Sequence, residues 1–303
     1  MAHKSNVTLT QLRYFVESAD QLSMTRAAQR LLVAQSAIST AIGQLEDQVG
    51  AQLFVRRRSK GLLLTAAGKA LLRDARSILM SLDEALDAAR GQGGEVRGSV
   101  RIACFVTLAP FVLPSLLAQL GTNYPELEID VVEADAAVAD VLVRNGDVEL
   151  AICYDFGFGD DIECEVIATS FPYLVLPKNH RLANRHEVTL TELADEPMVL
   201  LDLPRSRDYF MKMLSDAGVT PSVRYRSESY EAVRTLVARG HGFSILNQRP
   251  VSNLTYDGSE VAEVAITGAS NPLPVVLATL KSVRTTGRAR VVMEAAREHF
   301  RPH

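Results

Sequence analysis

The residues best suited to act on a partner are short polar side chains clustered on one predicted helix. Gln35, Ser36, Ser39 and Thr40 follow directly after Ala34 and leave the apolar positions of that helix uninterrupted. Amides and hydroxyls near a helix N-terminus can hydrogen bond to phosphate oxygens and to the edges of bases. This pattern indicates recognition of nucleic acid rather than the making or breaking of bonds.

A second chemical signal is the basic run Arg-Arg-Arg-Ser-Lys at residues 56–60, which lies between two short apolar segments. A bare charge run is usually a solvated loop. Two apolar segments around a basic tip also predict a β-hairpin wing, whose Arg and Lys reach the DNA backbone or the minor groove. We favour the wing because the run follows directly after a helix-turn-helix pattern.

Motifs for enzyme chemistry are absent from the sequence. The chain holds no G-x-S-x-G nucleophile motif and no G-K-[S/T] phosphate loop. His180, His186 and His241 lack partners at catalytic or metal-ligand spacing, and we interpret the spacing of His299 and His303 at the chain end as chance. We therefore expect no catalysis, no metal site and no cofactor.

The three cysteines are Cys104, Cys153 and Cys164. They form no C-x-x-C pair and have no histidine at ligand spacing, so neither a disulfide framework nor a zinc site is expected. Reduced thiols that pack as small hydrophobic groups explain them best. A redox switch through Cys153 and Cys164 is the alternative.

Length and composition favour an ordinary globular protein. The chain has 303 residues, 47% hydrophobic and 22% charged, which suffices for two or three domains with their own cores. No apolar run reaches the roughly 18 residues of a membrane span. The first residues, Met1–Asn6, lack the apolar core of a signal peptide, so we expect a cytoplasmic location.

The net charge of −4 conceals an asymmetry along the chain. Residues 1–65 contain eight Lys or Arg and four acids, a balance of about +4, so the remainder carries about −8. A basic N-terminal part on an acidic body indicates that nucleic acid meets the N-terminal part only.

Three short helices are predicted at the N-terminus. Leu9–Ala19 places apolar residues on one face, with Thr8 or Thr10 able to cap it. Ser23 is a plausible N-cap for a second helix that ends near Leu32. A third helix begins near residues 34–36, and Gly50 ends it as a left-handed C-cap. Its buried stripe is Ile38, Ile42, Leu45 and Val49.

Thr65 caps a long helix that runs from Ala66 to about Arg90 and carries a broad apolar stripe. Such a helix outside a compact domain needs a partner, and pairing with a second subunit buries the stripe most simply. A core helix of the next domain is the alternative. Gly91–Gly94 then reads as a flexible hinge.

Strands and helices alternate through the rest of the chain. Strands at Gly98–Phe105, Leu127–Glu133 and Glu149–Tyr154 alternate with helices, and this βαβαβ order predicts a parallel sheet. A strand at Tyr173–Pro177 opens a second α/β unit, and a helix at Val291–Phe300 closes the chain. Two α/β lobes leave a cleft beyond the strand ends, where open α/β folds bind ligands.

Polar residues in the loops at these strand ends are the candidate ligand contacts. The candidates for effector binding are Cys104, Phe105, Thr107, Tyr154, Asp155, Asp202, Arg205, Ser206 and Asn247. Arg205 or Arg207 suggests a carboxylate ligand, whereas Asp155 and Asp202 suggest a cation or a polyol. The residue types leave this choice open.

Residues 9–68 closely resemble the LysR-type transcriptional regulators, and the likeness continues at lower density to the C-terminus. The residues that carry the resemblance are Leu12-Arg13-Tyr14-Phe15, Ala27-Ala28-Gln29-Arg30-Leu31, Gln35-Ser36-Ala37-Ile38-Ser39, Ile42-Gly43-Gln44-Leu45-Glu46, Gly50-Ala51-Gln52-Leu53-Phe54, Leu64-Thr65-Ala66-Ala67-Gly68, Gly146-Asp147-Val148-Glu149-Leu150-Ala151-Ile152 and Val237-Ala238-Arg239-Gly240-His241-Gly242-Phe243.

The resemblance implies an α/β protein overall: a winged helix-turn-helix in residues 1–65, a linker and dimerisation helix in 66–96 and a periplasmic-binding-protein-like effector domain in 97–303. Lobe I would span about 97–169 plus 269–303, and lobe II about 170–268. The resemblance also implies a homodimer or homotetramer that binds promoter DNA, a small-molecule effector of unknown identity and contact with RNA polymerase. The candidate DNA-binding residues are Arg26, Gln35, Ser36, Ser39, Thr40, Gln44, Arg56, Arg57, Arg58 and Lys60.

Two departures from the family pattern affect the third helix. The family often has Ser or Thr where Ala34 stands, so we expect Ser36 to take over the cap. Basic residues are common in the family at Thr40, Gly43 and Gln44, which are uncharged here. We infer that phosphate anchoring falls more to the wing.

Two functions of other classes compete with a ligand-responsive transcription factor. An α/β enzyme with an attached DNA-binding module would need catalytic groups that the sequence does not show. A solute receptor that lost its signal peptide would not need an intact helix-turn-helix. A gel shift with upstream intergenic DNA distinguishes the three.

Overall fold

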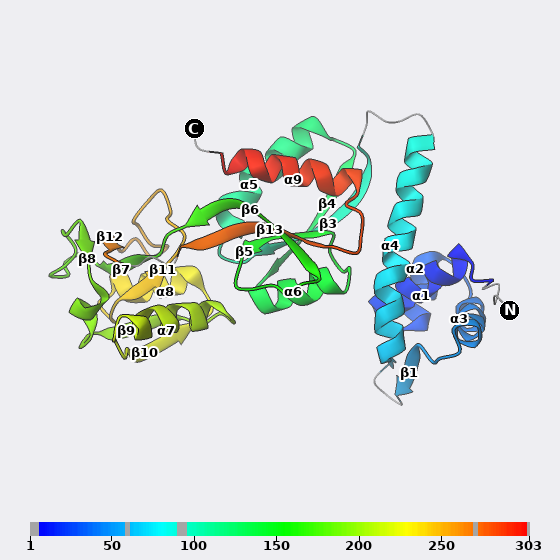
Figure 1. The fold of residues 1–303 in the computed structure, drawn as a ribbon, viewed down its shortest axis with the longest axis horizontal. Helices are drawn as coiled ribbons and strands as arrows, with labels where there is room; N and C mark the ends of the chain where they lie inside the picture. The colour runs from blue at the N-terminus through cyan, green and yellow to red at the C-terminus, as the bar shows by residue number, and fades with distance from the viewer. Residues whose placement is uncertain (1–5, 58–60, 90–95, 269–271, 302–303) are drawn as a thin grey trace.

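The computed structural model describes residues 6–57, 61–89, 96–268 and 272–301. Figure 1 shows a small N-terminal module of helices, a long upright helix α4 (Ala66–Ala89) and a body of two α/β lobes. The lobes lie on the side of α4 away from the N-terminal module. This arrangement confirms the predicted fold class.

The N-terminal module contains three helices and a two-stranded antiparallel hairpin, namely α1 (Leu9–Gln21), α2 (Met24–Leu31), α3 (Gln35–Val49), β1 (Phe54–Arg57) and β2 (Gly61–Leu64). Thr8 caps α1 in a reciprocal capping box with Gln11, and Ser23 caps α2 by accepting from the Arg26 N–H. Gly50 ends α3 at a φ of +74°. The predicted caps at Thr8, Ser23 and Gly50 are thus confirmed.

The expected cap of α3 is wrong. Ala34 occupies the N-cap position and makes no side-chain cap bond, and Ser36 lies inside the first turn of the helix. The turn before α3 is held by the backbone instead: Leu32 is left-handed, and the Val33 N–H donates to the Ala28 carbonyl at 3.0 Å. Because these backbone bonds fix the turn, α3 starts at Gln35, two residues too early for Ser36 to be its N-cap.

The apolar stripe of helix α4 is buried in its first half and partly exposed in its second half. Thr65 caps it by accepting from the Gly68 N–H at 2.9 Å, as predicted. Leu72 and Ala75 are buried in the core of the N-terminal module, whereas Ile78 and Leu86 are 48% and 42% exposed. The first half therefore behaves as a core helix, and only the remaining apolar positions are open to a partner. The glycines at 91–94 lie outside the described residues.

Lobe I is built on a five-stranded sheet in the order β4-β3-β5-β13-β6. Its strands are β3 (Gly98–Phe105), β4 (Leu127–Ala134), β5 (Leu150–Tyr154), β6 (Ile162–Ser170) and β13 (Leu273–Leu280). Helices α5 (Ala109–Asn123) and α9 (Gly287–His299) lie on one side of the sheet and α6 (Ala136–Arg144) on the other (Figure 1).

The sheet of lobe I is mixed, not wholly parallel. Strands β3, β4 and β5 are parallel as predicted, but β13 runs antiparallel to both of its neighbours, β5 and β6. Strand β6 was not predicted, because a register shift opposite Val275/Val276 leaves Ile167 unpaired and breaks its alternating pattern. Helix α9 begins at Gly287, four residues before the predicted start, where Thr286 caps it.

Lobe II holds a four-stranded sheet in the order β11-β7-β12-β8 and a parallel pair, β10-β9. The parallel bridge between Met198 and Phe243 places the pair beside β11. Its elements are β7 (Tyr173–Pro177), β8 (Glu187–Val188), the 3-10 helix η1 (Leu190–Leu193), β9 (Pro197–Leu201), α7 (Ser206–Asp216), β10 (Ser222–Ser227), α8 (Tyr230–Ala238), β11 (Ser244–Leu246) and β12 (Val261–Ile266).

Candidate functional site

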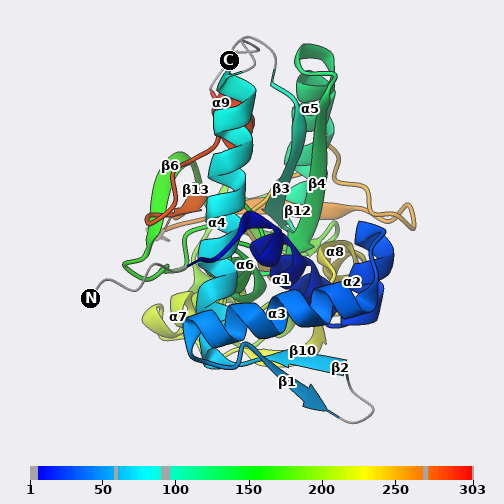
Figure 2. The same ribbon diagram turned by 90° about the vertical axis from the view of Figure 1, so that its right-hand side faces the viewer.

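Helix α3 presents the predicted polar face on the outside of the molecule. Ile38, Ile42 and Leu45 are completely or almost completely buried beneath it. On the other side Gln35, Ser36 and Thr40 are exposed and Ser39 is half-buried. Figure 2 looks onto this side, with α3 in front and the β1–β2 hairpin below it. The helix can therefore enter a groove without disturbing its own core.

The hairpin is fixed to α3 by one carboxylate. Oε1 of Glu46, in the last turn of α3, accepts from the Leu53 N–H at 2.7 Å and from the Phe54 N–H at 3.2 Å. The Leu62 N–H of the opposite strand donates to the Leu22 carbonyl at 3.0 Å. Both strands of the wing are therefore held to the helices of the module.

The predicted basic residues fall partly outside the described residues. Arg56 and Arg57 lie on β1, paired in register with Leu62 and Gly61. Arg58 and Lys60 are not among the described residues, so their role stays a prediction.

Arg26 and Gln44 are exposed but already engaged within the module. The Arg26 guanidinium donates to the Gln21 carbonyl, which ties it to the turn before α2. The Gln44 amide oxygen accepts from Gln11 Nε2 at 3.4 Å. Both side chains would have to give up these contacts to reach DNA.

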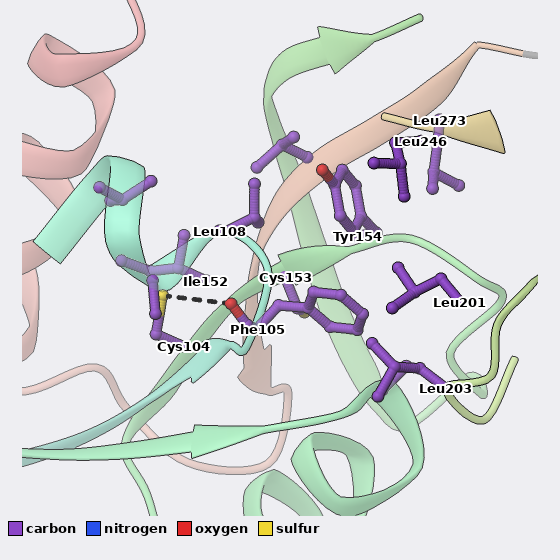
Figure 3. Close-up of a cluster of buried hydrophobic side chains, with 14 of the residues drawn as sticks. Cys104, Phe105, Leu108, Ile152, Cys153, Tyr154, Leu201, Leu203, Leu246 and Leu273 are labelled. Atoms are coloured by element: carbon purple, nitrogen blue, oxygen red, sulfur yellow. Dashed lines mark hydrogen bonds between the residues drawn. The ribbon is translucent and has the colours of Figure 1, made fainter. Parts of the chain in front are cut away.

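The loops predicted to line the cleft do meet between the lobes. Figure 3 shows Phe105 and Tyr154 of lobe I lying against Leu201, Leu203 and Leu246 of lobe II. These five side chains are at most 5% exposed, so they close an apolar seam between the lobes.

An aromatic series crosses the seam. The ring centroids of Phe105 and Tyr154 are 5.1 Å apart, those of Tyr154 and Phe156 6.0 Å, and those of Phe156 and Tyr209 6.1 Å. A second pair, Phe111 and Tyr230, lies 6.1 Å apart nearby. A molecule that enters the seam would meet mostly aromatic edges and faces.

Three tyrosines converge on Gln248, which sequence reasoning missed. Tyr173 and Tyr230 each donate to its backbone carbonyl at 2.6 Å, and Tyr154 donates to its Oε1 at 3.2 Å. Burial raises the pKa of Tyr230 to about 12 and the pKa of Tyr154 and Tyr173 further, so all three phenols stay neutral donors. Of the cluster, the sequence predicted Tyr154, and it also predicted Asn247, the neighbour of Gln248.

Two of the three charged candidates, Arg205 and Asp202, form ion pairs. Arg205, at an unusual φ of +63°, donates to Asp140 of α6 at 2.8 Å. Asp202 accepts from Arg207 at 3.1 Å. The Asp155 carboxylate accepts from the Gly157 N–H at 2.9 Å. These pairs balance the charges of Arg205 and Asp202, whereas a backbone donor leaves Asp155 its negative charge.

Two polar atoms at the seam lack a partner within the described part of the chain. Nη1 of Arg205 and Oδ1 of Asn247 are buried and make no hydrogen bond there. Each follows a seam residue closely, Arg205 after Leu203 and Asn247 after Leu246. Buried polar groups are rarely left unsatisfied, so these two atoms are the best candidates to receive a ligand.

The remaining cleft candidates are buried small side chains. Thr107 and Ser206 are 7% and 4% exposed and stand where α5 and α7 begin. Cys104 is fully buried, and burial, assisted by Glu133, raises its pKa to about 12.

The two cysteines considered as a redox pair lie apart. Cys153 faces Val276 and Cys164 faces Ala278 on β13, which runs between their strands. Two strand spacings amount to about 9–10 Å, beyond the reach of a disulfide. Burial raises the pKa of Cys153 well above its usual value and that of Cys164 to about 11.

The described ranges contain neither a metal-binding cluster nor a membrane-spanning helix. Within them, no His, Cys, Asp and Glu side chains gather in a group that could hold a metal ion. Nor is any helix there long and apolar enough to cross a membrane.

Comparisons with known proteins place both parts of the chain. Residues 9–69 match the family described as "Bacterial regulatory helix-turn-helix protein, lysR family", and residues 93–301 match "LysR substrate binding domain". The regulator YnfL of Escherichia coli is 32% identical over 246 residues, which cover 80% of this chain and 82% of YnfL.

A solved structure and a further relative agree. HinK, a LysR family transcriptional regulator from Pseudomonas aeruginosa, is 34% identical, with a TM-score of 0.65 over 97% of this chain and 99% of HinK. The "Hydrogen peroxide-inducible genes activator" of Pectobacterium carotovorum is 29% identical over 79% of this chain and 80% of its own length.

Proposed function

The chain belongs to the LysR family of transcriptional regulators, and from this premise we propose that the polar face of α3 reads the major groove of promoter DNA. The observation that carries the proposal is an exposed amide-and-hydroxyl face beside a wing fixed to the same helix by Glu46. Gln35, Ser36, Ser39 and Thr40 would contact base edges, and the wing arginines would contact phosphates. Such a regulator acts in the cytoplasm, where the promoter is.

We propose that the active form is at least a homodimer joined through α4. Ile78 and Leu86 remain exposed on a helix whose other face is already buried in its own module. A second α4 would cover them and place two recognition helices on one promoter. A homotetramer would repeat this pairing.

We propose that a small molecule binds in the inter-lobe seam and changes promoter binding. The aromatic walls and the ion pairs of Arg205 and Asp202 favour a ligand with a largely apolar body over a polyol. Its polar groups would accept from Arg205 Nη1 and donate to Asn247 Oδ1. No other cofactor is needed for this function.

A gel shift with the upstream intergenic DNA tests the proposal, together with a thermal-shift screen of metabolites on the full chain. Binding at low salt and a ligand-dependent rise in melting temperature support it. Turnover of a metabolite without any DNA shift would instead support the enzyme hypothesis, and ligand binding without any DNA shift would support the receptor.

Replacing Arg56 by alanine is expected to weaken binding to every DNA sequence by about the same factor and to reduce the salt slope of the binding constant by about one. The reason is that a wing arginine neutralises a phosphate and reads no base. Fluorescence anisotropy at several salt concentrations measures both effects. Arg101→Ala serves as the control, because Arg101 pairs with Asp130 on the surface of lobe I. An unchanged slope in Arg56→Ala would contradict the role of the wing.

Hydrogen peroxide is expected to leave promoter binding unchanged, unlike the response implied by the name of the Pectobacterium relative. Peroxide attacks thiolates, and burial holds the pKa of all three thiols far above neutral pH. Gel shifts before and after peroxide, with mass spectrometry of the thiols, check this. A peroxide-dependent loss of binding that Cys153→Ser or Cys164→Ser prevents would refute it.

A further inference from the structure

Arg76, near the middle of α4, joins three parts of the chain that are far apart in sequence. Its guanidinium donates to the carboxylates of Asp20, at the end of α1, and of Asp147, in the turn after α6. Its Nη1 also donates to the Asn145 carbonyl at 3.1 Å. Only 13% of the Arg76 side chain is exposed, so these contacts are largely shielded from solvent.

The turn after α6 is built to receive this cation. Gly146 adopts a φ of +65°, its N–H donates to the Val143 carbonyl at 3.0 Å, and the Asp147 N–H donates to the Leu142 carbonyl at 2.8 Å. This pattern is a Schellman motif, which leaves the Asn145 carbonyl at the negative end of the helix without an intrahelical partner. Arg76 supplies a donor to this carbonyl and adds a second positive charge to that of Arg144, in the last turn of α6.

The C-terminal end of α1 carries a negative charge that no basic residue of its last turn balances. Asp20 is the penultimate residue of α1, and the last turn of that helix contains no basic residue. A carboxylate at a helix C-terminus is unfavourable because it faces the negative end of the dipole. Arg76 therefore compensates two helix C-termini at once, one in the N-terminal module and one in lobe I.

Packing between α4 and the regular elements of lobe I is sparse. Among the described elements, α4 packs substantially only on α1 and β2, and no element of lobe I makes a comparable contact with it. An open groove of about 340 Å³ separates them beside Arg76, lined by Asp83, Arg101 and Arg288 among others. The Arg76 contacts are thus the main polar link between the two parts.

Helix α6 connects this link to the cleft. Asp140, in the middle of the nine-residue helix, accepts from Arg205 of lobe II at 2.8 Å and from Arg144 at 2.9 Å. A movement of lobe II that displaces Asp140 would shift the short helix α6. The turn at the C-terminal end of α6 is held by Arg76, so the shift would reach the Arg76 contacts.

We propose that Arg76, Asp20 and Asp147 form a clasp that holds the DNA-binding module against lobe I, and that lobe movement at the cleft opens or closes it through α6. Closing the clasp fixes the position of α3 relative to the effector domain of its own subunit. Opening it frees α4, and with it the recognition helix, to take another orientation.

Hydrogen exchange on the full-length protein tests the clasp directly and without DNA. In Arg76→Met, the amides of Gly146 and Asp147 and those of the last turn of α1 are expected to exchange at least about tenfold faster. The radius of gyration from small-angle scattering is expected to increase. Lys69→Met is the matched control, because Lys69 lies two turns away on α4 and is exposed. Equal exchange in the two variants would overturn the clasp.

Two more variants guard against a general loss of folding. Arg76→Lys keeps the charge but cannot hold two carboxylates and a carbonyl together, so intermediate exchange is expected. Asp147→Asn is expected to add nothing in the Arg76→Met background, because both remove the same link. Fully additive effects would show that the two residues act independently and would refute the clasp.

The connection to the cleft has its own test. Arg205→Met is expected to speed exchange at residues 145–148 in the natural background and to have no further effect when Arg76 is already Met. An unchanged rate at residues 145–148 in Arg205→Met would leave the clasp intact but overturn its control by lobe II.

Discussion

Replacing Thr40 with glutamate is expected to lower affinity for the promoter by at least about 100-fold while leaving the fold intact, a loss of about 2.7 kcal/mol. Thr40 is exposed in the middle of α3, on the side opposite the buried Ile38 and Ile42. A carboxylate there would lie in a groove lined by phosphates, where like-charge contact costs several kcal/mol. In a dimer both half-sites carry the change, so each subunit needs to contribute only about half of the loss.

Gln48→Glu is the matched control for this prediction. Gln48 is also exposed on α3, two turns nearer its C-terminus, and its replacement changes the net charge by the same amount. Anisotropy titrations and thermal melts of both variants separate the local effect from the general one. An equal loss of affinity in the two variants would mean that Thr40 does not face the groove.

The exposed polar face of α3 could be predicted because a helix repeats every 3.6 residues. The buried apolar stripe therefore determines which residues remain on the surface. The N-cap of α3 could not be predicted, because backbone hydrogen bonds hold the turn at Leu32 and Val33. Such bonds do not depend on residue type, so the sequence does not reveal them. Strand β6 escaped for a related reason, because one unpaired residue breaks the alternation that reveals a strand.

The cleft, too, could be predicted only in part from the sequence. The loops containing Phe105, Tyr154, Arg205 and Asn247 were predicted to converge because the ends of parallel strands share an edge. That Arg205 would form an ion pair was not predictable, since its partner Asp140 lies 65 positions before it. Hence the sequence left a carboxylate, a cation and a polyol equally open as ligands, whereas the contacts favour a largely apolar one.

The role of Arg76 illustrates what only the assembled chain reveals. In the sequence it is one arginine beside the apolar stripe of a long helix, which reads as a solvated position. Its partners lie 56 and 71 positions away, and neither carboxylate stands out on its own. The unusual feature is the placement of two helix C-termini against one cation, which depends on how three elements pack.

Gly68→Ala is expected to destabilise the N-terminal module by about 3 kcal/mol and to lower its melting temperature by roughly 10 °C or more. A Cβ at Gly68 would lie 2.2 Å from the Leu53 carbonyl oxygen and 3.0 Å from Leu64 Cδ2. The first of these atoms is backbone and accepts from the Thr65 N–H at 3.0 Å, so it cannot move without loosening the start of α4. Leu53 directly precedes strand β1 of the wing, so promoter binding should weaken as well.

Gly43→Ala is the control that isolates the steric cause. Gly43 is also in a helix of the N-terminal module, but a Cβ there would meet nothing within 4 Å. Alanine should therefore stabilise the module by up to about 1 kcal/mol, because glycine is the poorer helix former. Thermal melts followed by circular dichroism, with hydrogen exchange in α1 and α3, measure both variants. A Gly68→Ala protein as stable as Gly43→Ala would mean that α4 can move away from the wing without cost. The close contact between Gly68 and Leu53 would then not fix α4 relative to the wing.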